Sequence, residues 1–152
     1  MPTPLDIIIV SYNARAELEA CLGALRAHRP ARETRVVVVD NASRDGSADA
    51  AARAGPGAPG LPQASNLGFS RANNVGIRAT NAPLVLLLNS DTLAGAGAID
   101  RLVMALEATP AAAAAGPRLV DASGRPELSF GPMISPWNEL RQKILGRLYA
   151  RG

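Results

Sequence analysis

The feature that most constrains this chain is a set of short apolar runs, each followed at once by polar or acidic residues. The runs occupy residues 5–10, 35–39, 61–64 and 84–88. Their length and their Ile, Val and Leu content predict buried β-strands. Between them, apolar residues recur at helical spacing. Strands that alternate with helices indicate an α/β fold with a mostly parallel sheet and flanking helices.

The same spacing predicts where the helices lie. They are expected over residues 16–27, from Ser43 or Ser47 to 53, over 70–79 with Ser70 as the cap, and over 97–107. In the third helix, the residues expected on or near the inner face are Ala72, Val75, Gly76 and Ile77. The alanine run 111–115 fits either a helix or a short buried strand, because alanine favours helix but prolines flank the run. Residues 119–120 and 128–130 fit a hairpin.

Small polar or acidic residues follow all four predicted strands. In a parallel sheet they would meet at the carboxyl ends of the strands, where ligands of α/β proteins bind. Each group alone is compatible with an ordinary turn, but four together predict a binding site. Its members are Ser11, Tyr12, Asn13, Asp40, Asn41, Asn66, Gly68, Asn89, Ser90 and Asp91.

Two of these residues carry negative charge beside apolar strands. A desolvated, unpaired carboxylate is costly, so Asp40 and Asp91 each need donors or a cation. A divalent ion would suit Asp91, because Mg²⁺ binds to one or two carboxylates together with substrate phosphates. Asp40 could accept hydrogen bonds from a base N–H or a ribose hydroxyl. The alternative for Asp40 is a cap or turn role beside Ser43.

Four sequence segments resemble the successive signatures of the inverting family-two glycosyltransferases, which have the GT-A fold. The match is nearest to the rhamnosyltransferase-like branch, and both the order and the spacing of the segments agree. It covers roughly residues 5–130. The segments are IVSYN (9–13), VDNASRDGS (39–47), NLGFSRANNVG (66–76) and LNSDT (88–92).

The resemblance implies a role for each matching residue. Asp40 would bind the base or ribose, and Arg71 would lie near the base or diphosphate. Asp91 would be the last acid of a metal motif that holds Mg²⁺ or Mn²⁺ against the diphosphate. The motif's first acid is replaced here by Asn89, which leaves one carboxylate fewer for the metal. The full implied nucleotide-binding set is Ser11, Tyr12, Asn13, Asp40, Asn41, Asn66, Gly68, Arg71, Asn89 and Ser90.

The resemblance further implies a division of the chain. Residues 1–130 would form the nucleotide-sugar-binding domain, and 131–152 an amphipathic helix that begins the acceptor region. The implied activity is transfer, with inversion, from a dTDP-, UDP- or GDP-linked sugar to a glycan or lipid-linked acceptor. No acidic motif after Asp91 matches the family's general base. The alternative is therefore a non-catalytic nucleotide-binding module or degenerate fragment that acts with a partner chain.

Composition excludes other classes of protein. The formal charge is +3, but no cluster of basic and aromatic residues indicates nucleic-acid binding. Cys21 and His28 are each the only residue of their type, which excludes an internal disulfide and a Cys/His metal cluster. No signal peptide or membrane span is evident, so we expect a cytoplasmic protein. The basic amphipathic stretch 137–149 fits packing, self-association or contact with the inner face of a membrane.

Overall fold

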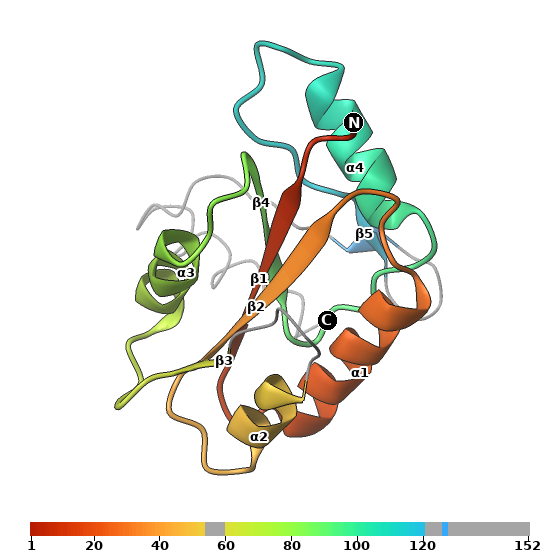
Figure 1. Ribbon diagram of the computed structural model, residues 1–152. Helices are drawn as coiled ribbons and strands as arrows, with labels where there is room; N and C mark the ends of the chain where they lie inside the picture. The colour runs from red at the N-terminus through yellow and green to blue at the C-terminus, as the bar shows by residue number, and fades with distance from the viewer. Residues whose placement is uncertain (54–59, 121–125, 128–152) are drawn as a thin grey trace, which may run out of the picture. The chain divides into compact units, whose positions relative to one another are not determined.

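The computed structural model describes residues 1–53, 60–120 and 126–127. The chain forms two compact units, residues 1–113 and 114–152. In the first unit, a parallel sheet has the strand order β3-β2-β1-β4 (Figure 1). Its strands are β1 (Leu5–Ser11), β2 (Thr34–Asp40), β3 (Gly60–Pro62) and β4 (Leu84–Asn89). The predicted α/β fold with a mostly parallel sheet is confirmed.

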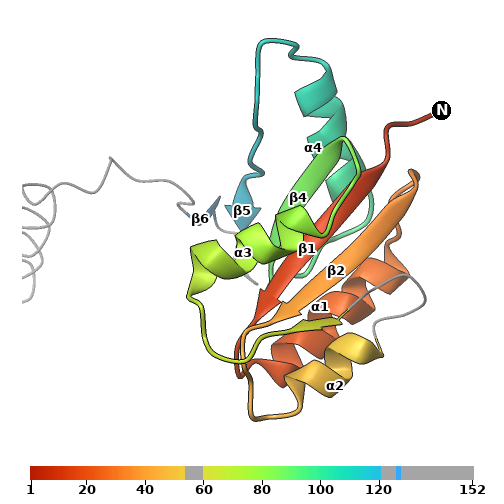
Figure 2. The ribbon, with the colours of Figure 1, turned by 60° about the vertical axis from the view of Figure 1, so that its left-hand side comes forward.

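Helices cover both faces of this sheet. They are α1 (Arg15–Ala27), α2 (Ser47–Ala52), α3 (Phe69–Arg78) and α4 (Ala98–Glu107). Helix α3 packs on one face, and the other three pack on the opposite face (Figure 2). Among the described helices, none has the length and apolar character needed to cross a membrane.

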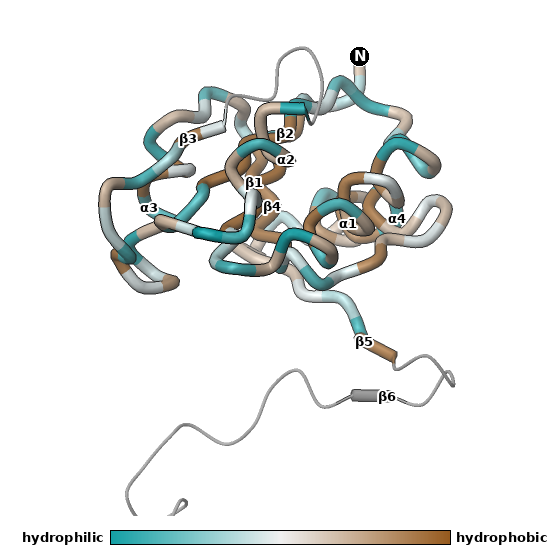
Figure 3. Tube along the Cα trace, turned by 90° about the horizontal axis from the view of Figure 1, so that it is seen from below, coloured by the Kyte–Doolittle hydropathy of each residue, from teal (hydrophilic) through white to brown (hydrophobic). Residues whose placement is uncertain are grey.

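The core follows from the alternation of side chains along β1. Ile7 and Ile9 are fully buried against α1, while Ile8, between them, is buried on the α3 side. Because successive side chains of a strand point to opposite faces, the middle of a strand covered on both faces is apolar at consecutive positions. In Figure 3 the strands are coloured largely as hydrophobic, whereas the helices beside them mix hydrophobic and hydrophilic residues.

Helix α3 approaches the sheet closely because of one glycine. A Cβ atom built on Gly76 would overlap Cγ2 of Ile8 and would lie 3.3 Å from Cγ2 of Val39. No larger residue fits between this helix and the sheet without a shift. The expectation that Gly76 lies on the inner face is therefore confirmed.

The predicted start of one helix needs correction. Helix α3 begins at Phe69, so Ser70 lies inside it, and the preceding Gly68 has the left-handed φ of +77°. Ile77, expected on or near the inner face, is 40% exposed, whereas Asn73 is buried. Helix α2 begins at Ser47, one of the two starts that the sequence left open. A glycine turn precedes both helices, and for α3 the sequence pattern had favoured a serine cap instead.

The segment after α4 also differs from expectation. The alanine run 111–115 forms neither a helix nor a strand and is largely exposed, since flanking prolines prevent a helix and no apolar side chains longer than alanine drive burial. In the second unit, β5 (Leu119–Val120) pairs antiparallel with β6 (Pro126–Glu127). The first predicted strand of the hairpin, 119–120, is confirmed, its partner strand is 126–127, and the predicted second strand, 128–130, lies outside the described residues. The domain boundary at residue 130 and the helix within 131–152 lie outside the described residues.

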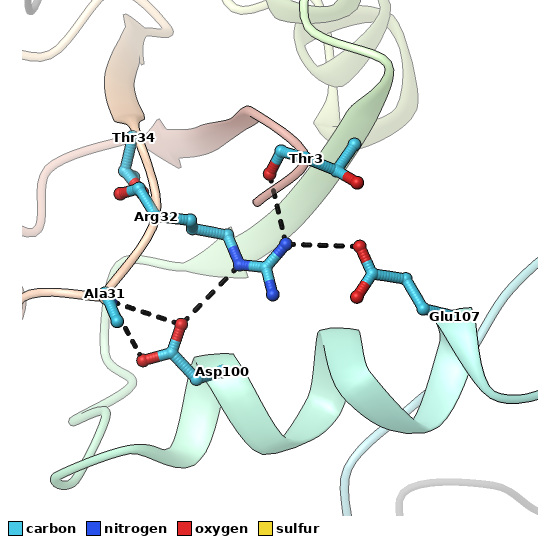
Figure 4. A network of polar contacts seen from close by, with 6 residues as sticks. All are labelled: Thr3, Ala31, Arg32, Thr34, Asp100 and Glu107. Atoms are coloured by element: carbon cyan, nitrogen blue, oxygen red, sulfur yellow. Dashed lines mark hydrogen bonds and ion pairs between the residues drawn. The ribbon is translucent and has the colours of Figure 1, made fainter. Parts of the chain in front are cut away.

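A buried arginine fixes α4 to the rest of the first unit (Figure 4). The Arg32 side chain is 6% exposed, and its Nη1 donates to the Thr3 carbonyl at 3.0 Å. The same guanidinium pairs with Asp100 at 3.5 Å and with Glu107 at 3.3 Å, both on α4. The backbone N–H of Ala31 also donates to Asp100. These contacts anchor the helix that follows the Asp91 loop.

Candidate functional site

The strand register brings the predicted polar residues to one edge of the sheet. Ser11 of β1 pairs with Asp40 of β2, and Val10 pairs with Asn89 of β4. The strands are parallel, so their carboxyl ends and the loops that follow lie together. We call this region the carboxyl edge: the ends of β1, β2 and β4 with residues 12–14, 41–46, 63–68 and 90–97.

Two buried oxygen atoms at the carboxyl edge lack protein partners. Ser11 is fully buried and Asp40 is 3% exposed. One Asp40 oxygen, Oδ2, accepts a hydrogen bond from the Ser43 backbone N–H at 3.2 Å. Asp40 Oδ1 and Ser11 Oγ have no hydrogen-bond partner within the described part of the chain. Such groups are costly when unpaired, and both of these lie at the carboxyl edge. The turn role considered for Asp40 thus uses only one of its oxygens.

The Asn41 and Asn66 side chains build the loop that leads into α3. Asn41 Nδ2 donates to Asn66 Oδ1, and Asn41 Oδ1 accepts from the Leu67 backbone N–H, both at 2.8 Å. Asn66 Oδ1 also accepts from the Gly68 backbone N–H at 2.8 Å. The Asn41 amide group and the Asn66 Oδ1 atom are therefore used within the protein. Any contact they make with a nucleotide stays a prediction.

A second network joins the loops after β1 and β2. The Asn13 backbone N–H donates to Ser43 Oγ at 2.9 Å, and the Arg44 backbone N–H donates to Asn13 Oδ1 at 2.8 Å. Asp45 accepts from the backbone N–H groups of Arg15 and Ser47, and from the Ser47 hydroxyl. Hydrogen bonds from Ser47 and Arg15 outweigh desolvation and lower the pKa of Asp45 below its ordinary value.

Sequence reasoning missed Asp45 as an individual residue. It appeared only within a motif, although an Asp that can bond the backbone two residues later is a recognisable turn signal. That signal identifies the turn that leads into α2. It carries no information about the contact with Arg15, thirty positions away.

Asp91 lies in the turn that follows β4 and is exposed. The Thr92 backbone N–H donates to the Asn89 carbonyl at 3.1 Å, and the Cys21 thiol lies 3.8 Å from the same oxygen. Burial, aided by the charge of Asp91, raises the pKa of the Cys21 thiol to about 11. Cys21 is thus a buried neutral thiol beside the Asn89 carbonyl.

The residues around Asp91 can supply only part of a metal site. No group of three acidic, Cys or His side chains able to hold a metal occurs among the described residues. Within the same residues, no hydrogen bond or ion pair occupies the Asp91 carboxylate. Mg²⁺ commonly takes one or two protein carboxylates and completes its shell with water and substrate phosphates. A single free carboxylate therefore fits a metal that arrives with a diphosphate.

Three other predicted residues are exposed at the carboxyl edge or beside it. Tyr12 is 49% exposed, and Arg71 lies exposed on the first turn of α3. Ser90 is partly exposed in the turn that carries Asp91. These side chains are free to meet a ligand, and their roles as nucleotide contacts stay predictions.

A separate cavity of about 330 Å³ lies at the opposite edge of the sheet, and its lining includes Asp6, Glu33 and Arg35. The Asp6 carboxylate there is already satisfied: Arg35 pairs with it at 2.9 Å and the Asn81 and Ala82 backbone N–H groups donate to it. Burial acts to raise the pKa of Asp6, but these hydrogen bonds bring it below its ordinary value. We read this cluster as a structural ion pair.

Solved structures confirm the class of fold. The mannosyltransferase PcManGT of Pyrobaculum calidifontis, in complex with GDP-Man and Mn²⁺, superimposes with a TM-score of 0.57 at 24% identity, over 61% of this chain and 29% of that one. TarS residues 1–349 of S. aureus, in complex with UDP-GlcNAc, gives a TM-score of 0.62 at 20% identity, over 70% of this chain and 32% of that one. The fold is GT-A-like and matches part of each full structure.

Sequence comparison then defines the family. The model for glycosyl transferase family 2 matches residues 6–150, so the chain belongs to that family. An N-acetylglucosaminyl-diphospho-decaprenol L-rhamnosyltransferase from two strains of Mycobacterium tuberculosis is 33% identical over 162 residues. The alignment covers 99% of this chain and 52% of the relative. The chain thus spans about half the length of the curated relatives it matches, and the expected family resemblance is confirmed.

Proposed function

We propose that this chain binds the nucleoside-diphosphate-sugar donor of a glycosyltransferase at its carboxyl edge. The observation that carries the proposal is the pair of buried oxygens, Ser11 Oγ and Asp40 Oδ1, that have no partner within the described residues. A hydroxyl and a carboxylate at these strand ends can accept hydrogen bonds from a ribose hydroxyl or a base N–H. Structural neighbours solved in complex with GDP-Man and with UDP-GlcNAc support the same ligand class.

The separation of the two acids suits such a ligand. Asp40 ends β2, whereas Asp91 follows β4, and β1 lies between these two strands. Adjacent strands are about 4.8 Å apart, so the two strand ends are separated by about 10 Å. A nucleoside diphosphate has its base and ribose at one end and its diphosphate at the other. Asp40 would take the nucleoside end and Asp91 the diphosphate end.

Asp91 would hold the divalent cation, Mg²⁺ or Mn²⁺. The cation would act as a Lewis acid toward the negative charge that grows on the departing diphosphate. The protein's part is to hold the nucleoside through Asp40 and Ser11, and to present the Asp91 carboxylate from a turn fixed on β4. Inversion would require attack by an acceptor hydroxyl on the opposite face of the sugar, aided by a general base.

Calorimetry tests this proposal directly. We expect the folded chain to bind at least one of UDP, dTDP and GDP, and to bind it more tightly with Mn²⁺ than with EDTA. A nucleoside without phosphates should show no dependence on Mn²⁺. Absence of binding by all three diphosphates, in protein shown to be folded by circular dichroism, would contradict the proposal.

A nucleotide-binding module that acts with a partner chain is the second candidate. The chain spans 52% of the length of a curated relative, an L-rhamnosyltransferase. The rhamnosyltransferase name of that relative suggests a glycan or lipid-linked acceptor for the whole protein. Donor binding without acceptor-dependent sugar transfer by the purified chain would favour the module. Transfer above the rate of donor hydrolysis would favour the complete enzyme.

A further inference from the structure

We propose that Asp45 is a positioning residue, which holds the loop after β2 against the start of α1 and thereby keeps Asp40 in place for the nucleoside. The inference rests on the proposed function, since it concerns how that binding site is built. Asp45 itself would not touch the ligand. It would act through Ser43 and Asp40.

One carboxylate caps two helices. Asp45 Oδ2 accepts from the backbone N–H of Arg15, the first residue of α1, at 2.8 Å. Asp45 Oδ1 accepts from the backbone N–H of Ser47, the first residue of α2, at 3.0 Å, and from its hydroxyl at 2.6 Å. The first N–H groups of a helix have no partner within the helix. The residues directly before these helices, Ala14 and Gly46, make no side-chain cap of their own.

The same loop reaches Asp40 through Ser43. The Ser43 hydroxyl accepts from the Asn13 backbone N–H at 2.9 Å, and the Ser43 backbone N–H donates to Asp40 Oδ2 at 3.2 Å. Arg44, between Ser43 and Asp45, donates its backbone N–H to Asn13 Oδ1. The consecutive residues Ser43, Arg44 and Asp45 therefore tie the loop by hydrogen bonds to residues 13–15 and to Asp40, whose other oxygen lacks a partner within the described residues.

The loop needs such an anchor because its backbone is strained. Ala42 has a φ of +69°, a left-handed conformation that is unfavourable for a residue with a Cβ. Strained backbone persists only where the surrounding contacts enforce it. When the Asp45 contacts are removed, we expect the loop to relax at Ala42 and to carry the Ser43 N–H away from Asp40.

Substitution of Asp45 tests this role. The ligand for this test is whichever of UDP, dTDP and GDP the wild type binds most tightly. Without metal, Asp45→Ala should bind this diphosphate about tenfold more weakly than the wild type does, because losing a partner that orients a ligand-binding group typically has an effect of that size. Asp45→Asn keeps one acceptor oxygen, so its affinity for the diphosphate should lie between those of the wild type and Asp45→Ala. Asp49→Ala is the matched control and should bind the diphosphate as tightly as the wild type. Asp49 is an exposed acid of α2 with no side-chain hydrogen bond to another described residue.

Two further measurements separate positioning from a loss of stability. In a cycle with Asp40→Ala, the double variant should bind no more weakly than Asp40→Ala alone, because Asp45 acts through Asp40. In ligand-free protein, Asp45→Asn should speed hydrogen exchange of the Ser43 amide, while Asp49→Ala leaves it unchanged. Three results would each overturn the inference. They are additive losses of affinity in the double variant, a lowered Tm with unchanged affinity in the Asp45 variants, and unchanged exchange of the Ser43 amide in Asp45→Asn. A wild type that binds no diphosphate would instead contradict the proposed function, and the exchange measurement would still test Asp45.

Discussion

Gly76→Ala should lower the free energy of unfolding by about 1–3 kcal/mol, the usual cost of forcing an extra methyl group into a packed core. The new Cβ would overlap Cγ2 of Ile8, which is fully buried on the central strand β1. Ile8 cannot turn into solvent, and Val39 closes the other side. The helix propensity of alanine, about 1 kcal/mol better than that of glycine, would offset only part of this cost. Urea unfolding of both proteins measures the difference.

Gly23→Ala provides the matched control. Gly23 lies in the interior of α1, is exposed, and has no atom within 4 Å of the place its Cβ would take. The same substitution there should raise the free energy of unfolding by about 0.5–1 kcal/mol. Ile8→Leu removes the branch at Cβ that carries Cγ2, and in the Gly76→Ala background it should recover part of the loss. A Gly76→Ala protein as stable as the wild type would contradict the close packing of α3 on β1.

Asp40→Ala should weaken binding of a nucleoside diphosphate by about 10- to 100-fold, with or without Mn²⁺. The estimate follows from the 1.5–3 kcal/mol typical of a hydrogen bond to a charged group. Stability without ligand should stay unchanged or rise. The substitution removes a buried oxygen that lacks a partner in the described structure, which favours stability. The only hydrogen bond to the Asp40 carboxylate that it removes within the described residues comes from the Ser43 backbone N–H. Calorimetry and urea unfolding on the same preparations check both effects.

Asp91→Ala should behave differently. Its effect on diphosphate binding should be about as large in Mn²⁺ but close to zero in EDTA, because Asp91 acts through the cation. Asn89→Asp, which adds a second acid two residues before Asp91, should strengthen the dependence on Mn²⁺. If Asp40→Ala and Asp91→Ala respond alike to EDTA, the separate nucleoside and metal roles are wrong.

Much of the architecture could be predicted from local pattern. Runs such as Ile7–Ile9 and Val36–Val39 are too apolar and too short for anything but buried strands, and the spacing of Leu18, Cys21, Leu22 and Leu25 gave the buried face of α1 correctly. Parallel pairing then followed from the alternation with helices, and it placed Ser11, Asp40 and Asn89 at one edge. The start of α3 was less well predicted, because the glycine turn at Gly68 competes with the nearby Ser70, which looks like a cap.

The sequence by itself thus determined the order of strands and helices, the family and the edge that carries the polar residues, since all of these depend on neighbours along the chain. Only the tertiary structure decided how each polar side chain is used. Asn41 and Asn66 form hydrogen bonds that hold the loop before α3. Asp45 joins the starts of α1 and α2, and Asp40 keeps one oxygen without a partner in the described residues. The Asn41–Asn66 and Asp45–Arg15 contacts join residues 25 and 30 positions apart in the chain, and a local pattern holds no information about which of them meet.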